Sequence, residues 1–172
     1  MPVPGLAHPS GVWNTVYGIQ NTNVKNCFAS DFCFIYFERT DYVGHVDGWM
    51  SPAYLKALEQ ADMAIGHVLI GLEKAGLRDS YHFVVLSDHG GSDHHHTTTD
   101  HVVMDIPWIA SGPTIRSDHV IRGAVSIVDT APTLARILEI SPHPVWEGKV
   151  VDEVFLEQTR DRSQKADDGG QR

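Results

Sequence analysis

The sequence lacks any continuous apolar run long enough to cross a lipid bilayer, which requires about 20 residues. Its N-terminus also lacks the charged and apolar regions of a secretory signal peptide. Basic residues are few: 13 Lys and Arg stand against 22 Asp and Glu, for a formal net charge of −9. We therefore expect neither a nucleic-acid-binding surface nor a membrane partner, and an anionic ligand would need a local cation. The compartment stays open.

Cysteine is also scarce, since only Cys27 and Cys33 occur in the chain. Cys33 stands inside an apolar run, and two cysteines are too few for a disulfide framework. We expect both to be reduced thiols.

The remaining composition is that of a globular domain. With 172 residues and 42% hydrophobic residues, the chain is long enough for one domain with a real core. Residues 1–30 show early prolines and glycines without apolar periodicity, and residues 159–172 are polar. We predict an irregular lead over 1–30, a metal-binding α/β domain over 31–158 and a disordered tail over 159–172.

Two apolar runs flank one long amphipathic segment. Residues 32–37 are apolar on both faces and predict a central strand, followed by a polar loop over 38–45. Ser51-Pro52 predicts a helix start, with Gly76 as its end. Its expected buried stripe comprises Leu55, Leu58, Ala61, Ile65, Val68, Leu69 and Leu72.

Residues 81–87 predict a second strand, so that 32–87 would form a β-α-β unit with parallel strands. Residues 106–110 predict a third strand. Asp129-Thr130 predicts the start of a helix that runs to about Glu139. The expected fold class is α/β, a mostly parallel sheet with flanking helices.

Histidine is the compositional outlier, with 11 in the chain. Asp41 and His45 follow the first strand, and Asp88 and His89 follow the second. Parallel strands would bring both pairs to the same sheet edge, where open α/β sheets bind ligands. Carboxylate and imidazole suit a borderline divalent cation. We therefore predict a metal site at this edge.

A cluster of further histidines follows in the same loop. Of His94, His95 and His96, one or two are expected to be ligands. His101 is expected to be an ordinary loop residue, and His67 and His82 to lie at the surface or the edge of the core.

The ordered motifs resemble the C-terminal half of the alkaline phosphatase superfamily, in its type I phosphodiesterase/nucleotide pyrophosphatase-like and sulfatase-like branches. The resemblance runs from Phe32 to Phe155. It consists of Asp41-x-x-Gly44-His45, Ser87-Asp88-His89-Gly90-Gly91, Ile106-Pro107-Trp108-Ile109-x-x-Gly112-Pro113 and Val125-x-Ile127-x-Asp129-x-Ala131-Pro132-Thr133.

The resemblance implies two divalent metal ions, usually zinc and in some branches manganese. It assigns Asp41, His45 and His96 to one metal, and Asp88 and His89 to the other. His94 and His95 are the alternatives to His96 if the loop register differs. The implied reaction is hydrolysis of a phosphate mono- or diester, or of a sulfate ester.

The sequence departs from the family at its N-terminal side. The family's Ser or Thr nucleophile and a further Asp ligand are expected well upstream of Asp41, and only 40 residues precede it. Asp31 stands at the wrong end of its strand, and the hydroxyl residues before Asp41 lack an Asp partner, namely Ser10, Thr15, Thr22 and Ser30. We expect the metal-binding half without a nucleophile segment.

Three hypotheses remain open at this point. The chain is one piece of a hydrolase whose N-terminal half is missing or separate, or it is a non-catalytic metal-binding remnant. The third is a mononuclear hydrolase that uses Asp41, His45 and His96 to hold a metal with an open position.

Overall fold

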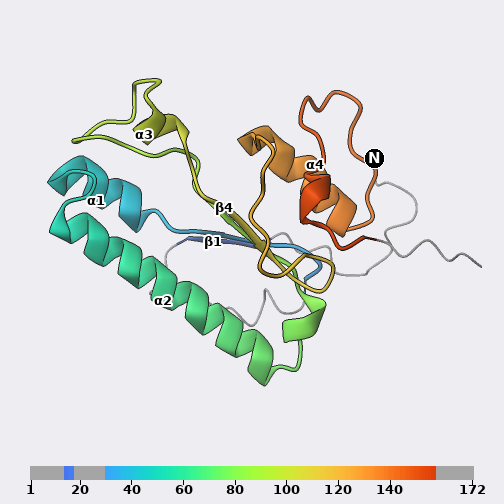
Figure 1. Cartoon of the computed structure of the whole chain (residues 1–172). Helices are drawn as coiled ribbons and strands as arrows, with labels where there is room; N and C mark the ends of the chain where they lie inside the picture. Colours follow the sequence, from blue (N-terminus) through green and yellow to red (C-terminus); the bar gives the residue numbers. More distant parts are fainter. Residues whose placement is uncertain (1–13, 18–29, 158–172) are drawn as a thin grey trace, which may run out of the picture.

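A computed structural model describes residues 14–17 and 30–157 of the chain (Figure 1). Of the predicted segments, the tail over 159–172 and all of the lead except 14–17 and Ser30 lie outside these residues. The strands are β1 (Asn14–Tyr17), β2 (Cys33–Tyr36), β3 (Phe83–Leu86) and β4 (Trp108–Ser111). The helices are α1 (Arg39–Asp47), α2 (Pro52–Lys74), α3 (His101–Met104) and α4 (Thr130–Ile137), with short 3₁₀ turns η3 (Arg78–Ser80), η4 (Ile127–Asp129) and η5 (Asp152–Val154).

The described strands form two pairs rather than one sheet. β1 pairs with β2 in parallel, Asn14 opposite Cys33, and β3 pairs with β4 in antiparallel, Phe83 opposite Ser111. The combination of helices and strands is compatible with the α/β class, but a mostly parallel sheet is not confirmed. The chain leaves β3 through the histidine loop and α3, then returns to β4 from the same edge (Figure 1). That path makes β4 antiparallel.

The segment predicted as a polar loop is helix α1, so this prediction was wrong. Its first hydrogen bond joins the Tyr42 N–H to the Glu38 carbonyl at 3.1 Å. Gly44 suggested a loop, but its role is packing: a Cβ there would lie 2.6 Å from Cε2 of Trp49. The helix ends at Asp47, and the next residue, Gly48, has a φ of 92° that favours glycine.

The predicted start and end of α2 are confirmed. The Ser51 side chain accepts a hydrogen bond from the Tyr54 N–H at 3.1 Å. Gly76 has a φ of 70°, and the following Leu77 N–H reaches back to the Leu72 carbonyl at 2.9 Å. The predicted stripe was wrong for two residues, because Leu55 is 42% exposed and Leu58 is 49% exposed.

The buried positions of α2 are Ala57, Ala64 and Leu72.

None of the helices among the described residues is both long and apolar enough to span a membrane. Cys33 is disulfide-bonded, so the prediction of reduced thiols was wrong.

The main hydrophobic cluster lies beside β4 and α4, with Ile115, Val151, Val154 and Phe155 at its centre. The predicted helix start at Asp129-Thr130 is confirmed, but the Asp129 side chain does not cap α4. Instead it accepts the N–H groups of Ser126 and Lys149, each at 2.9 Å. These bonds lower the pKa of the Asp129 carboxyl, with Lys149 contributing most.

Candidate metal centre

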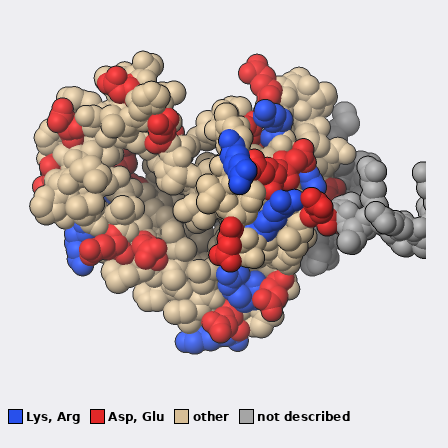
Figure 2. All heavy atoms as spheres, in the orientation of Figure 1, with Lys and Arg blue, Asp and Glu red and all other residues tan. Residues whose placement is uncertain are grey.

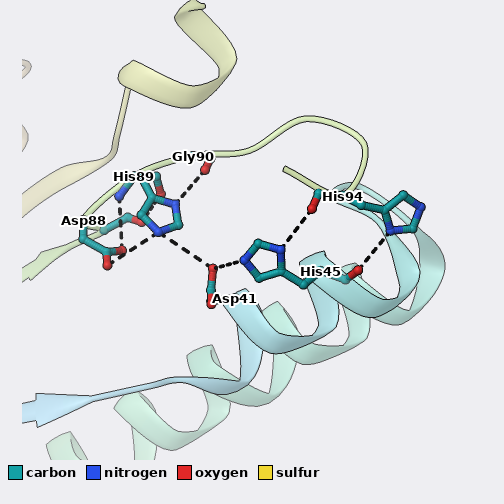
Figure 3. A network of polar contacts seen from close by, with 7 residues as sticks. Asp41, His45, Asp88, His89, Gly90 and His94 are labelled. Atoms are coloured by element: carbon teal, nitrogen blue, oxygen red, sulfur yellow. Dashed lines mark hydrogen bonds and ion pairs between the residues drawn. The ribbon is translucent and has the colours of Figure 1, made fainter. Parts of the chain in front are cut away.

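Helix α1 and the loop after β3 place their polar side chains against each other (Figure 3). Asp41 and His45 are four residues apart on α1 and therefore share one face of the helix. His89 approaches the same face from the loop. The distance from Asp41 Oδ1 is 3.5 Å to His45 Nε2 and 3.8 Å to His89 Nε2. The segments that follow β2 and β3 therefore meet, although these two strands belong to different sheets rather than to one parallel sheet.

Asp41 Oδ1 is the unusual atom of this cluster. It is buried and has no hydrogen-bond partner, although the Asp41 side chain as a whole is 38% exposed. An unsatisfied buried acceptor costs about 1–3 kcal/mol, and more when it is charged. A cation between the carboxylate and the two imidazoles would remove that cost. The residues present therefore fit a divalent metal ion.

Backbone carbonyls orient the two rings and place a hydrogen on each Nδ1. His45 Nδ1 lies 2.9 Å from the His94 carbonyl, and His89 Nδ1 lies 2.8 Å from the Gly90 carbonyl. Because a carbonyl only accepts, each Nδ1 carries the hydrogen, and each neutral ring keeps its lone pair on Nε2. Both Nε2 atoms face Asp41 Oδ1 (Figure 3). This is the tautomer that metal binding through Nε2 requires.

His96 completes a group of three. Its ring stacks on His89 with centroids 3.8 Å apart and lies 5.0 Å from the His45 ring. One ligand atom each from Asp41, His45 and His96 lie within 4.8 Å of one another, close enough to hold one ion. Among residues 30–157, no other group of His, Cys, Asp and Glu meets this criterion.

Asp88 and His89 are near this group but outside it. Asp88 Oδ2 lies 3.7 Å from His89 Nε2, while Oδ1 accepts the His89 N–H at 3.1 Å. The Asp88 side chain is 65% exposed. Asp88 and His89, with Asp41 beside them, therefore form a more exposed group than Asp41, His45 and His96.

The neighbouring histidines have other partners. His94 donates from Nδ1 to the His45 carbonyl at 3.1 Å, near the end of α1. His95 is exposed and its backbone pairs with Ser92. His101 begins α3 rather than lying in a loop, and its side chain is 95% exposed.

His67 and His82 were predicted to lie at the surface or at the edge of the core. His67 is exposed on α2. His82 is half-buried with Nε2 at 2.8 Å from Thr114 Oγ1, and burial lowers the pKa of its imidazole.

Sequence reasoning missed Trp49 and Tyr54, which line the same centre. The Trp49 ring meets His45 edge-on with centroids 5.0 Å apart, and Tyr54 lies 6.2 Å from Trp49. Burial and the nearby Asp41 charge raise the pKa of the Tyr54 hydroxyl. Neither residue type is a typical metal ligand. The glycines in both sequence motifs were the available signal, because they mark places where a bulky group packs closely.

The charge around the centre is one-sided. Neither segment that builds it, 40–55 or 79–115, contains a single Lys or Arg. Figure 2 shows acidic side chains over the part formed by α1 and α3, while Lys and Arg lie mostly over α2 and on the α4 side. A phosphate here would meet no cationic side chain from these segments. A bound metal would have to supply the positive charge.

A sequence model of the type I phosphodiesterase/nucleotide pyrophosphatase family matches residues 12–155. The chain belongs to this family. Venom phosphodiesterase 1 of Crotalus adamanteus is 37% identical over 60 residues, which cover 35% of this chain and 7% of that protein. Ectonucleotide pyrophosphatase/phosphodiesterase family member 3 of Mus musculus is 39% identical over 59 residues, 34% of this chain and 7% of that protein.

The chain thus spans about 7% of the length of these curated relatives. No solved structure matches it significantly.

Proposed function

We propose that this chain carries a divalent metal centre of a phosphodiester hydrolase, with Asp41, His45 and His96 as ligands of one ion. The observation that carries the proposal is that one ligand atom each from Asp41, His45 and His96 lie within 4.8 Å of one another. The buried Asp41 Oδ1, which has no hydrogen-bond partner, supports it. Asp and His donors suit zinc first and manganese second. The family membership supports phosphodiester hydrolysis as the reaction.

Asp88 and His89 provide a position for a second ion. His89 Nε2 faces both Asp88 and Asp41, so Asp41 stands between the two positions. With only these donors, the second position needs a further ligand. In the sequence before Asp41 we find neither that Asp nor a Ser or Thr in the arrangement of the family's nucleophile.

The side chains of this centre act by orientation and charge. The carbonyls of His94 and Gly90 hold His45 and His89 with Nε2 toward the centre. A metal pair would polarise a phosphoryl oxygen and lower the pKa of an attacking hydroxyl. Since no Lys or Arg stands between Arg39 and Lys56 or between Arg78 and Arg116, the substrate would be a small phosphate ester, or a sulfate ester, that is held by the metal. Turnover would also need a hydroxyl nucleophile close to the bound metal.

Metal analysis of the purified chain, combined with assays on bis-p-nitrophenyl phosphate and p-nitrophenyl phosphate, tests the proposal. We expect zinc or manganese to bind at one ion per chain or more, and Asp41→Asn and His96→Ala to remove it. His101→Ala is the matched control, because it removes an exposed histidine near the same loop. If both Asp41→Asn and His96→Ala leave the metal content unchanged, the proposed metal centre is wrong.

Turnover is a separate outcome of the same experiment. Metal binding without hydrolysis of either ester fits a non-catalytic remnant or one piece of a split enzyme. Hydrolysis that His96→Ala abolishes, with one ion per chain, fits the mononuclear hydrolase instead.

A further inference from the structure

Trp49 joins the two segments that build the metal centre. It follows α1, and its N–H donates to the Asp93 carbonyl in the histidine loop at 2.7 Å. Its indole meets the His45 ring edge-on at 5.0 Å and the His96 ring at 6.0 Å. One residue therefore contacts the helix, the loop and two of the three proposed ligands.

The indole occupies space that two glycines leave open. A Cβ at Gly44 would lie 2.6 Å from Trp49 Cε2, and a Cβ at Gly91 would lie 2.1 Å from the same atom. Real Cβ atoms do not approach so closely, so any side chain at either position would push the indole away. At each glycine, the three nearest atoms all belong to Trp49.

These glycines stand next to the ligands in sequence. Gly44 precedes His45 on α1, and Gly91 lies two residues after His89 in the loop. The indole therefore lies between the helix carrying Asp41 and His45 and the loop carrying His89 and His96.

We infer that Trp49 is a positioning residue of the metal centre: its indole, held between Gly44 and Gly91, sets the distance across which the ion is bound. The inference rests on the proposed metal centre and adds to it a residue that is not itself a ligand. A tryptophan that only filled the core would affect stability and leave the affinity of the folded protein for metal unchanged.

Titration of the full metal-free chain with Co²⁺, followed by visible absorption and equilibrium dialysis, separates these roles. Loss of groups that orient ligands typically weakens metal binding by about 10–100-fold. We expect Trp49→Ala to raise the Co²⁺ Kd by that factor and to alter the visible bands, with Trp49→Phe in between. Trp146→Ala is the matched control, because Trp146 is 45% exposed and stands in the segment between α4 and η5, outside the segments that build the centre.

Gly91→Ala provides a second line that does not depend on truncating Trp49. In the otherwise unchanged chain, the added methyl must displace the indole, so the Co²⁺ Kd should rise by about 10-fold or more. In a Trp49→Ala background the same methyl has room and should cost little further affinity. Such non-additivity is the signature of two groups in contact.

The outcomes distinguish the two proposals. If the unchanged chain binds no Co²⁺, or Asp41→Asn leaves binding unchanged, the metal centre itself fails. If Asp41→Asn abolishes binding but Trp49→Ala stays within threefold of the unchanged chain, the centre stands and the role of Trp49 is wrong. If Trp49→Ala does not fold, as judged by circular dichroism, Trp49→Phe and Gly91→Ala decide, and unchanged Kd values for both overturn the inference.

Discussion

Asp129 beside α4 and Asp41 on α1 each place a carboxylate oxygen inside the protein, but their surroundings differ. Both Asp129 oxygens accept backbone N–H groups, from Ser126 and Lys149. Asp41 Oδ1 accepts none and faces two imidazole nitrogens. The protein thus satisfies one carboxylate with its own backbone and leaves an oxygen of the other without a hydrogen-bond partner. The contrast supports the proposal that Asp41 is a ligand, whereas Asp129 is structural.

Glu153 belongs with Asp129 in this comparison. It accepts the N–H groups of Arg122 at 2.9 Å and Gly123 at 3.1 Å, and it lies 3.0 Å from His119 Nε2. The backbone bonds, first that of Arg122 and then that of Gly123, lower the pKa of its carboxyl. The region beside α4 thus contains two carboxylates that accept hydrogen bonds from backbone N–H groups.

The largest expected effect is the stabilisation of the protein by zinc bound at the proposed metal centre. At a free zinc concentration 100 times its Kd, binding should raise the free energy of unfolding of the unchanged chain by about 2.7 kcal/mol. Asp41→Asn should remove this gain, because the variant loses the oxygen that stands between the imidazoles. Urea unfolding with zinc and with EDTA measures both values. Equal zinc stabilisation of the two proteins would show that Asp41 is not a ligand.

Asp129→Asn should act in the opposite way. One of two backbone N–H groups would lose its acceptor and the other its charged acceptor, so the free energy of unfolding should fall by about 2 kcal/mol. The Co²⁺ affinity of the folded variant should not change, since Asp129 lies beside α4. Urea unfolding and Co²⁺ titration test the two parts. A variant with altered Kd and unaltered stability would reverse the comparison.

Much of the candidate metal centre could be predicted from the sequence alone. The two Asp-His pairs each come directly after an apolar run, so the ends of two strands were expected to bring them together. The structure does group Asp41, His45 and His96 within 4.8 Å, although their role as ligands stays a prediction. The restriction to His96 came from the family resemblance, because three adjacent histidines give no local reason to prefer one.

Other features depend on contacts that a local pattern does not contain. Helix α1 has no apolar stripe and includes Gly44, so its sequence favoured a loop, and the packing of Trp49 explains the glycine. The direction of β4 depends on the path of the loop and α3. The exposure of Leu55 and Leu58 likewise depends on which neighbours α2 has, not on its own periodicity.

Acid should lower the free energy of unfolding through the two carboxylates beside α4, Asp129 and Glu153. Asp129 and Glu153 have pKa values below their unfolded values of about 3.9 and 4.3, so their contributions are present above those values. The stabilisation is lost as the pH falls through the lower folded values. Unfolding free energies measured from pH 6 to pH 3 should therefore decrease, and Asp129→Asn with Glu153→Gln should flatten the curve. An unchanged slope in the double variant would contradict this.

The smallest effect is expected for His94→Ala, which removes a side chain next to the proposed ligands. The substitution removes the bond from His94 Nδ1 to the His45 carbonyl but keeps the His94 carbonyl that orients His45. An exposed hydrogen bond contributes about 0.5 kcal/mol, so the Co²⁺ Kd should change about twofold. His96→Ala, measured beside it, should abolish binding. The reverse order would make His94 the third ligand and place the loop in a different register.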